Sequence, residues 1–349
     1  MDGGAALASE ASSQRGESIV GAPDTRPEPG SSARARADSG VMPTLVCLGL
    51  GYCARHYVRE LGARFDRIAG TTRNAERMAA LGRERLGGRP IEVMLFDGTS
   101  APHDLVEAIA RADALLISAA PAEGRDPVLA VLADEIERAP RLSSVVYLST
   151  LGVYGDSGGA WIDESVETIP ALARRGSARI DAERAWQALG ARRNLPVAIL
   201  RLGGIYGPGQ NGMVRLLRGT VHRIAKPGHV SNRVHVYDIA QAIDAAFARR
   251  ADGAFNVVDD EPASPSEQIA FAAQLIGIEP PPEIPYAEAA KVVTPFALSF
   301  YDGCIRARND KLKAVLSVTL RYPNYREGLR ALYEAGDHLA APTPTALAE

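Results

Sequence analysis

Short apolar runs alternate with helical patterns along most of this chain, and this alternation constrains its fold more than any other feature. Runs such as "TLVCLGL" (44–50), "RIAGTT" (67–72) and "SVVYLST" (144–150) have the length and β-branched content of buried strands. Helix-length amphipathic segments separate them, as right-handed crossovers between parallel strands require. The sequence therefore predicts an α/β fold, a doubly wound parallel sheet covered by helices on both faces.

The organisation of the chain follows from where this alternation begins and ends. Residues 1–41 are rich in Gly, Ala, Ser, Pro and charge and show no apolar period, so we predict a disordered tail. The acidic residues of this segment disfavour an organellar transit peptide. Translation starting at Met42 is an alternative. We expect the sheet domain in 42–258, with 204–232 contributing to a second lobe. A small C-terminal lobe then spans 259–336, and 337–349 form a flexible tail.

Composition limits the classes of partner. The net charge of −3 offers no basic surface for nucleic acid or for an anionic membrane, so a small-molecule partner is favoured. No apolar run reaches the roughly 18 residues of a membrane span. Cys47 and Cys53 lack a second pair that would complete a zinc site, so we expect no metal and reduced thiols in a soluble, cytoplasmic protein.

A glycine-rich motif follows the first predicted strand. In "GLGYCA", Gly49, Gly51 and Ala54 have G-x-G-x-x-A spacing and open a helix. Gly49 permits a tight turn, Gly51 lets the backbone approach a pyrophosphate, and Ala54 allows close contact between helix and strand. The backbone at Leu50 and Tyr52 completes the loop, at a helix N-terminus that favours anions. The motif predicts a Rossmann-type dinucleotide site; the alternative is a glycine turn without a ligand.

The end of the second strand bears on which dinucleotide binds. A site for NAD usually carries an acid there to bind the ribose 2′-hydroxyl. This strand ends "AGTTRN", where Thr71, Thr72 and Arg73 offer hydroxyls and a guanidinium suited to a 2′-phosphate. Arg73 also precedes a helix that Asn74 would cap. We therefore favour NADP over NAD, which stays possible; the alternative for Arg73 is a solvated side chain.

The third and fourth strands end in further candidate cofactor residues. Asp97 of "FDG" can accept a hydrogen bond from an adenine amino group or begin an Asp-Gly turn with Gly98. Ala119, Ala120 and Pro121 end the fourth strand and are small enough for a cofactor to lie across them.

Together these stretches resemble the extended short-chain dehydrogenase/reductase family, in particular its atypical, NAD-dependent epimerase/dehydratase-like members. The resemblance runs from about Met42 to Leu332, on the segments "GLGYCA", "GTTR", "LFDG", "STLGVYG", "LRLGGIYGPG", "RVHVYDIA", "FNVVDDEPAS" and "YPNYREGL". It implies an NAD(P)-binding Rossmann fold with a small C-terminal substrate lobe.

The resemblance also implies a catalytic Ser or Thr, and a Tyr-x-x-x-Lys pair downstream. Thr150 takes the hydroxyl position, with Ser149 beside it, but none of the 11 tyrosines is followed by Lys at the fourth position. Arg175 and Arg179 stand near the Tyr and Lys positions; arginine stays protonated, so Arg175 cannot act as the proton donor. Arg179 could keep the electrostatic role of the lysine, and Tyr154 could replace the acid or simply pack.

A second departure concerns the substrate. Nucleotide-sugar enzymes of the family tend to carry Asn where this chain has Gly204, which puts sugar-nucleotide recognition in doubt. Polar side chains that remain as candidates around the substrate are Arg201, Tyr206, Arg233 and His235.

Three polar residues near these segments have structural alternatives. "HVYD" can simply end a strand, with His235 buried and Asp238 capping the next helix. Glu164 either binds substrate or is solvated.

Two functions from different classes fit these residues. The first is an NADP-dependent oxidoreductase or epimerase/dehydratase-type enzyme for a small polar metabolite, with Thr150 holding the substrate oxygen and Tyr154 or water as proton donor. The second is a dinucleotide-binding redox sensor or scaffold without turnover. The missing Tyr-Lys pair favours this second function, whereas the intact "STLGVYG" loop and the helix start around Ser177 favour the enzyme. A monomer or a homodimer is expected.

Overall fold

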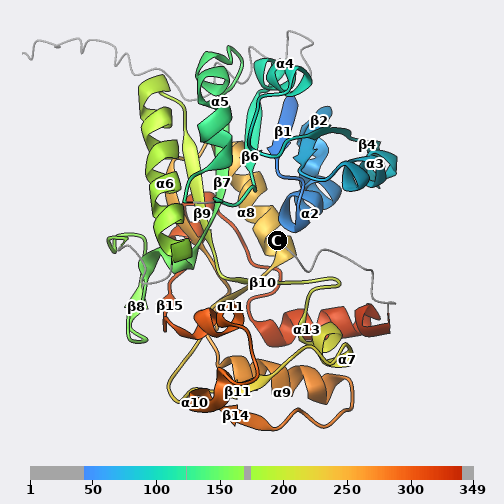
Figure 1. Ribbon diagram of the computed structural model, residues 1–349, viewed down its shortest axis with the longest axis vertical. Helices are drawn as coiled ribbons and strands as arrows, with labels where there is room; N and C mark the ends of the chain where they lie inside the picture. Colours follow the sequence, from blue (N-terminus) through green and yellow to red (C-terminus); the bar gives the residue numbers. More distant parts are fainter. Residues whose placement is uncertain (1–42, 123, 169–173, 340–349) are drawn as a thin grey trace, which may run out of the picture. The chain divides into compact units, whose positions relative to one another are not determined.

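A seven-stranded parallel sheet forms the centre of the protein. The computed structural model describes residues 43–122, 124–168 and 174–339, which belong to one compact unit (Figure 1). Along the sheet the strand order is β13-β9-β7-β6-β1-β2-β5. The strands are β1 (Thr44–Leu48), β2 (Arg67–Thr72), β5 (Glu92–Leu95), β6 (Ala114–Ile117), β7 (Ser144–Thr150), β9 (Val197–Leu202) and β13 (Gly253–Val257). The predicted doubly wound sheet is confirmed.

Helices cover both faces of this sheet. One face carries α2 (Tyr52–Leu61), α8 (Val236–Arg249) and α12 (Asp310–Leu316), and the other carries α4 (His103–Arg111), α5 (Pro127–Arg138) and α6 (Arg174–Arg193). Helix α3 (Ala75–Arg83) lies against strand β5. Side chains alternate between two buried clusters, as the period of a strand requires: Leu45 and Cys47 face α2, whereas Val46 and Leu48 face α4.

A smaller lobe lies beyond the carboxyl ends of the strands (yellow to red in Figure 1). Its helices are α7 (Gly212–Leu217), α9 (Pro265–Leu275), α10 (Tyr286–Ala289), α11 (Pro295–Leu298) and α13 (Tyr325–Glu334). Residues that precede and follow α8 in the sequence form the core of this lobe: Tyr206 and Met213 pack with Tyr325 and Leu329.

Short strand pairs complete the fold. They are β3 (Arg85–Leu86) with β4 (Arg89–Pro90), β8 (Trp161–Ile162) with β15 (Arg306–Ala307), β10 (Gly204–Tyr206) with β12 (Arg233–His235), and β11 (Arg223–Ala225) with β14 (Glu283–Pro285). The 3-10 turns in the described part of the chain are η1 (Gly62–Arg64), η2 (Leu151–Tyr154), η3 (Ser299–Tyr301) and η4 (Asp337–Leu339). Strands of two or three residues carry no readable period, so their pairing could not be predicted from the sequence.

Two helix starts test the predicted caps. Asn74 caps α3 as predicted, since its side chain accepts a hydrogen bond from Arg77 N. The prediction that Asp238 caps α8 is wrong: His235 is the N-cap and accepts from Tyr237 N. Asp238 is instead buried and accepts hydrogen bonds from the backbone N–H groups of Arg321 and Tyr322.

The C-terminal end of the fold lies further along the chain than predicted. The predicted tail over 1–41 lies outside the described residues, as do 340–349. Asp337, expected in the C-terminal tail, begins η4 and accepts hydrogen bonds from Gly209 N at 3.0 Å and from the Asn211 amide at 2.6 Å. The folded part therefore reaches Leu339.

The cysteine prediction can be compared directly. Cys47 and Cys53 are free, buried thiols, and burial raises the pKa of each to about 12. They are consequently thiols and not thiolates at neutral pH. Across the described residues, no helix has the length and apolar character needed to cross a membrane.

Candidate functional site

The predicted cofactor residues converge on one edge of the sheet. In a parallel sheet the carboxyl ends of neighbouring strands lie side by side, and the register places Leu48 beside Ile117 and Thr72 beside Leu95. The segments that follow β1, β2, β5 and β6 therefore share this edge. Thr150, at the end of β7, pairs with Leu202 and continues it.

Gly49 is required by the fold itself. Its φ is +94°, and a Cβ there would lie 2.8 Å from Ala119 N. Gly49 N donates to Thr71 Oγ1 at 2.9 Å, while Leu50 N donates to Thr71 O at 2.7 Å. Thr71 is almost fully buried, so the expectation that its hydroxyl meets a 2′-phosphate is wrong: it holds the loop in place.

Gly51 has a different status. It is the N-cap of α2, its φ is −84°, and a Cβ there would meet only Ser118 Oγ, at 3.9 Å. The polypeptide would tolerate a side chain here, so the absence of one leaves space for a ligand. Helix α2 has no side-chain cap and no acid in its first turn, which keeps its N–H groups available to an anion.

Two further residues of the motif, Ala54 and Tyr52, connect the start of α2 to its surroundings. Ala54 is fully buried between α2 and the sheet. The Tyr52 hydroxyl donates to Pro208 O at 3.1 Å and joins the start of α2 to the loop after β10.

The end of β2 leaves two side chains at the surface of the edge. Thr72 Oγ1 accepts from Asn74 N at 3.5 Å, and Arg73 is exposed.

After β5, the turn interpretation is the one that the structure shows. Asp97 accepts from Thr99 N at 2.9 Å and from the Thr99 hydroxyl at 2.7 Å, and these bonds hold the pKa of Asp97 below its usual value. Gly98 follows with φ +84°. After β6, Ala119 N donates to Leu48 O at 2.9 Å, and Ala120 is exposed while Pro121 is half-buried.

Ser149 and Thr150 point to opposite faces of β7, as neighbours on a strand do. Ser149 is buried and donates to Glu183 Oε1. Thr150 is half-buried, and its Oγ1 accepts from Gly152 N at 3.2 Å, so the hydroxyl hydrogen can still be donated. Thr150 is therefore the hydroxyl that the edge presents.

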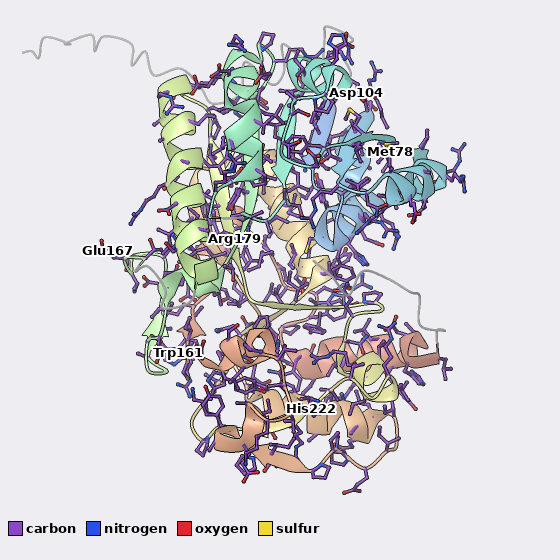
Figure 2. All side chains as sticks on the ribbon, viewed as in Figure 1. Met78, Asp104, Trp161, Glu167, Arg179 and His222 are labelled. Atoms are coloured by element: carbon purple, nitrogen blue, oxygen red, sulfur yellow. The ribbon has the colours of Figure 1, made fainter. Side chains whose placement is uncertain are left out.

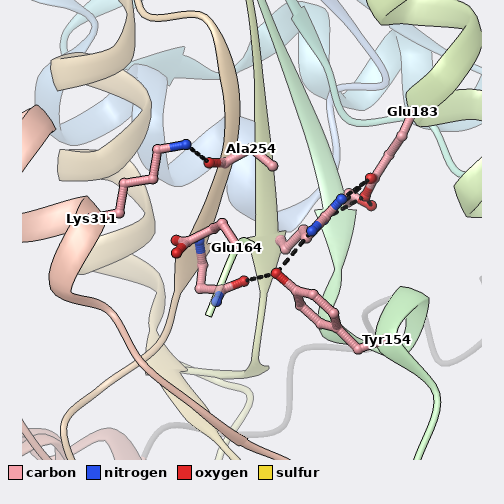
Figure 3. Close-up of polar contacts among 8 residues, drawn as sticks. Tyr154, Glu164, Glu183, Ala254 and Lys311 are labelled. Atoms are coloured by element: carbon pink, nitrogen blue, oxygen red, sulfur yellow. Dashed lines mark hydrogen bonds and ion pairs between the residues drawn. The ribbon is translucent and has the colours of Figure 1, made fainter. Parts of the chain in front are cut away.

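A buried polar network lies beneath this edge (Figure 3). Arg201 pairs with Glu183 at 2.7 Å and donates to the Tyr154 hydroxyl at 2.8 Å. That hydroxyl in turn donates to Asn256 Oδ1 at 2.8 Å. Burial raises the pKa of Tyr154, and Arg201 offsets part of that shift.

Several residues expected near substrate belong to this network or to its surroundings. Arg201 was predicted beside the substrate, but a buried guanidinium needs a partner and its own is Glu183. Glu164 is half-buried, and one of its carboxylate oxygens accepts a hydrogen bond from Asn256 N at 2.6 Å. The sequence carried no local signal for Glu183 or Asn256, which meet their partners only through the tertiary fold.

Arg179 lies at the lower end of α6 beside the sheet (Figure 2). It donates to Leu148 O at 2.7 Å and to the Tyr147 hydroxyl at 3.2 Å. Its guanidinium thus contacts β7 just before Ser149. Arg175 is within α6, and its side chain lies outside the described residues.

Tyr206 and His235 pack against each other inside the small lobe. Their ring centroids are 5.1 Å apart, and the His235 ring lies 4.1 Å from that of Tyr322. Burial lowers the pKa of His235 to about 3, so the imidazole is neutral at physiological pH. Arg233, the remaining predicted substrate residue, is only half-buried.

No cluster of three or more metal-ligating side chains occurs in residues 43–122, 124–168 and 174–339. This edge instead combines a helix N-terminus, small residues and the hydroxyls of Thr72 and Thr150. Such a set suits an extended dinucleotide with a substrate beside it.

Comparison with known proteins agrees with this geometry. The chain is 30% identical over 149 residues to a 3-diazoavenalumate denitrifying reductase from Streptomyces sp.; the alignment covers 41% of this chain and 49% of that protein. The chain thus spans about half the length of the curated relative it matches. Among solved structures, a conserved protein of unknown function from Silicibacter pomeroyi is 44% identical with a TM-score of 0.74, over 84% of this chain and 99% of its own.

A more distant structure shows the fold alone. MoeE5 in complex with UDP-glucose and NAD is 22% identical, with a TM-score of 0.65 over 85% of this chain and 100% of its own. The family model described as "NAD dependent epimerase/dehydratase family" matches residues 46–258, more than half of the chain. This protein therefore belongs to the NAD-dependent epimerase/dehydratase family.

Proposed function

We propose that this protein is an NADP-dependent oxidoreductase or epimerase/dehydratase-type enzyme that acts on a small polar metabolite. The observation that carries the proposal is the open space beside the Cα of Gly51. The chain leaves a side-chain-sized space at the uncapped start of α2, and no contact among the described residues accounts for it. A pyrophosphate held by the N–H groups of the helix does account for it.

The choice of NADP rests on the end of β2. No acid stands there to bind a ribose 2′-hydroxyl, and the positive charge of the exposed Arg73 supports a 2′-phosphate as its partner. The hydroxyl of Thr72 lies next to it and is only half-buried.

Within this proposal Thr150 orients the substrate oxygen and water supplies the proton. The Tyr154 hydroxyl already donates to Asn256 and accepts from Arg201 inside the protein, so we assign Tyr154 to positioning η2. The nicotinamide, when bound, supplies hydride chemistry. Small polar metabolites are favoured over nucleotide sugars because Gly204 replaces the Asn that nucleotide-sugar enzymes of the family tend to carry.

A second candidate function, a dinucleotide-binding redox sensor without turnover, is favoured by Arg179. This residue stands where the resemblance expects the catalytic lysine, but its guanidinium is bound to Leu148 O and Tyr147. A protein that binds NADPH and turns over no substrate would fit this arrangement.

Fluorescence titration of the full chain with NADPH and NADH tests the shared part of both functions. Gly51→Trp should abolish binding, whereas Gly82→Trp, at an exposed glycine with nothing within 4 Å of its Cβ position, should not. Arg73→Ala should weaken NADPH about tenfold and leave NADH unchanged, because one charge-assisted contact is lost; Arg77→Ala is its control. Equal binding by wild type and Gly51→Trp would refute the proposal.

A substrate screen with NADPH then separates the two functions. Thr150→Val should lower kcat and leave NADPH affinity unchanged if the hydroxyl orients the substrate. Tight NADPH binding with no turnover across polar carbonyl and hydroxy compounds would support the sensor.

A further inference from the structure

The guanidinium of Arg233 lies directly over the backbone of Gly204. The two residues are partners in the β10–β12 pair, and a Cβ on Gly204 would lie 3.2 Å from both Cδ and Cζ of Arg233, with Nη1 closer still. Gly204 does not have a positive φ, so its backbone conformation does not demand glycine. The space that the glycine leaves is occupied by the arginine.

This arginine lies close to the edge that carries Thr150. Thr150 pairs with Leu202, and Gly204 comes two residues after Leu202 along the chain. Arg233 O also accepts a hydrogen bond from Asp259 N at 2.7 Å, just beyond the end of β13. The backbone of Arg233 therefore lies beside the segments that follow β9 and β13, and its side chain contacts Gln268 of the small lobe.

Among the described residues, Arg233 has no salt bridge. Arg233 Nε donates to the amide oxygen of Gln268, which is uncharged. Within the part of the chain that the structure describes, no carboxylate forms an ion pair with Arg233 and neither Nη group donates a hydrogen bond. Burial is the main cause that lowers the pKa of Arg233, and the positive charge of Arg215 on α7 lowers it further.

Asp259 interacts electrostatically with Arg233, yet in the described residues its carboxyl oxygens are not within ion-pair distance of the guanidinium. The side chain is almost fully buried, and its Oδ2 makes no hydrogen bond with the described residues. Burial raises the pKa of Asp259 to about 8, so the carboxyl is mostly protonated at neutral pH. In that state it is a hydrogen-bond donor beside a guanidinium.

His229 adds an unpartnered group to the same cluster. It is 4% exposed, and neither ring nitrogen has a hydrogen-bond partner in the described part of the chain. Its ring stacks on Tyr301 with centroids 5.2 Å apart, and Arg233 is among the charges that lower its pKa. A buried imidazole without a partner costs free energy, which a bound polar ligand would remove.

We propose that Arg233, supported by Arg215 and His229, binds an anionic group of the substrate, a carboxylate or a phosphate. An arginine with both Nη groups unused offers a planar fork that matches either anion with two parallel hydrogen bonds. The inference rests on the proposed function for the position of the rest of the substrate, which would extend from this anchor toward Thr150.

The test uses benzoate and inorganic phosphate as anionic probes and benzamide as the neutral analogue of benzoate. Each is titrated into the full-length protein, at ionic strength matched with sodium chloride, while the midpoint of thermal unfolding is followed. At least one anion should raise the midpoint in wild type, and benzamide should not. Benzoate alone assigns a carboxylate substrate, and phosphate alone assigns a phosphate ester.

Arg233→Gln should weaken the active anion about tenfold or more, since a charge-assisted pair is lost. Arg330→Gln, on the exposed side of α13, is the matched control and should bind as wild type does. Anion binding at the start of α2 would be the same in both variants, so only the Arg233-dependent part counts. Equal affinity in wild type and Arg233→Gln would overturn the proposal, as would no response to either anion.

Arg233→Lys provides a second variant in case the glutamine fails to fold. It keeps the charge but lacks the fork, so the affinity for the active anion should again fall. NADPH titration of the same variants keeps the two proposals apart. Arg233→Gln should bind NADPH as wild type does. If wild type does not bind NADPH but binds the anion through Arg233, the proposed function is refuted and the anion site remains supported.

Discussion

Arg201 and Glu183 form a buried ion pair that joins strand β9 to helix α6. Their closest atoms are 2.7 Å apart, and the two side chains are 8% and 4% exposed. Ser149 of β7 adds a hydrogen bond to the same carboxylate. Two strands and a helix thus meet at one carboxylate beneath the edge that carries Thr150.

Glu183→Gln should destabilise the protein by about 3–5 kcal/mol, because it leaves the Arg201 guanidinium buried without a counter-charge. Urea denaturation gives the free energy of unfolding. The control is Glu137→Gln, which breaks an exposed pair with Arg192 and should cost no more than about 1 kcal/mol. Similar losses in the two variants would show that the buried pair does not hold α6 to the sheet.

Tyr154→Phe should also act on stability and not on cofactor binding. The substitution leaves Arg201 and Asn256 each without one hydrogen-bond partner, which costs about 1–3 kcal/mol. Tyr237→Phe is the control, since the Tyr237 hydroxyl forms no hydrogen bond with other described residues. NADPH affinity should match wild type in both. A Tyr154→Phe protein of unchanged stability but abolished turnover would instead make this phenol the proton donor.

The sheet and the phosphate loop could be predicted from sequence because both depend on local patterns. Buried strands carry continuous apolar runs, and the glycines of the loop are fixed by spacing relative to β1. Thr71 shows the limit of this reasoning. Its hydroxyl looked like a ligand group, but whether it points to the loop or to solvent is set by which face of β2 is buried.

The candidate site was harder to predict because its polar groups come from distant parts of the chain. Arg201 and His235 read as substrate residues in sequence, and the fold uses one in an ion pair and the other as a helix cap. The sequence around Arg201 does not predict Glu183 as its partner, since ion pairs have no sequence period. The Gly204–Arg233 contact was likewise invisible, because it depends on the register of two short strands.

A double-mutant cycle tests that contact. Gly204→Ala should destabilise the wild-type protein by about 1–3 kcal/mol, because the new Cβ overlaps the guanidinium and forces it aside. The same alanine should cost less than about 0.5 kcal/mol in the Arg233→Gln background if the shorter side chain leaves the space empty. Equal costs in the two backgrounds would mean that the alanine acts on the strand and not on Arg233.

Asp259 should make stability depend on pH in a direction opposite to that of most carboxyls. Its pKa is raised from 3.8 to about 8, chiefly by burial, so between these values the folded protein keeps a proton that the unfolded chain has lost. The contribution of this group is fully present below pH 3.8 and is lost as pH rises to about 8. The charged or titratable groups that face it are Arg233, Asp260, Glu261, Tyr206 and Tyr325.

Asp259→Asn removes this titration and keeps the shape of the side chain. The free energy of unfolding of wild type minus that of the variant should fall from pH 4 to pH 8, by at most about 1.4 kcal/mol per pH unit. Urea denaturation at a series of pH values measures it. Asp156→Asn is a control of opposite sign, because backbone hydrogen bonds from Cys304 and Gly158 lower the pKa of Asp156. A flat difference for Asp259→Asn would mean that this carboxyl is ionised in the folded protein and already neutralises Arg233, which would leave no unpaired charge for an anion to meet.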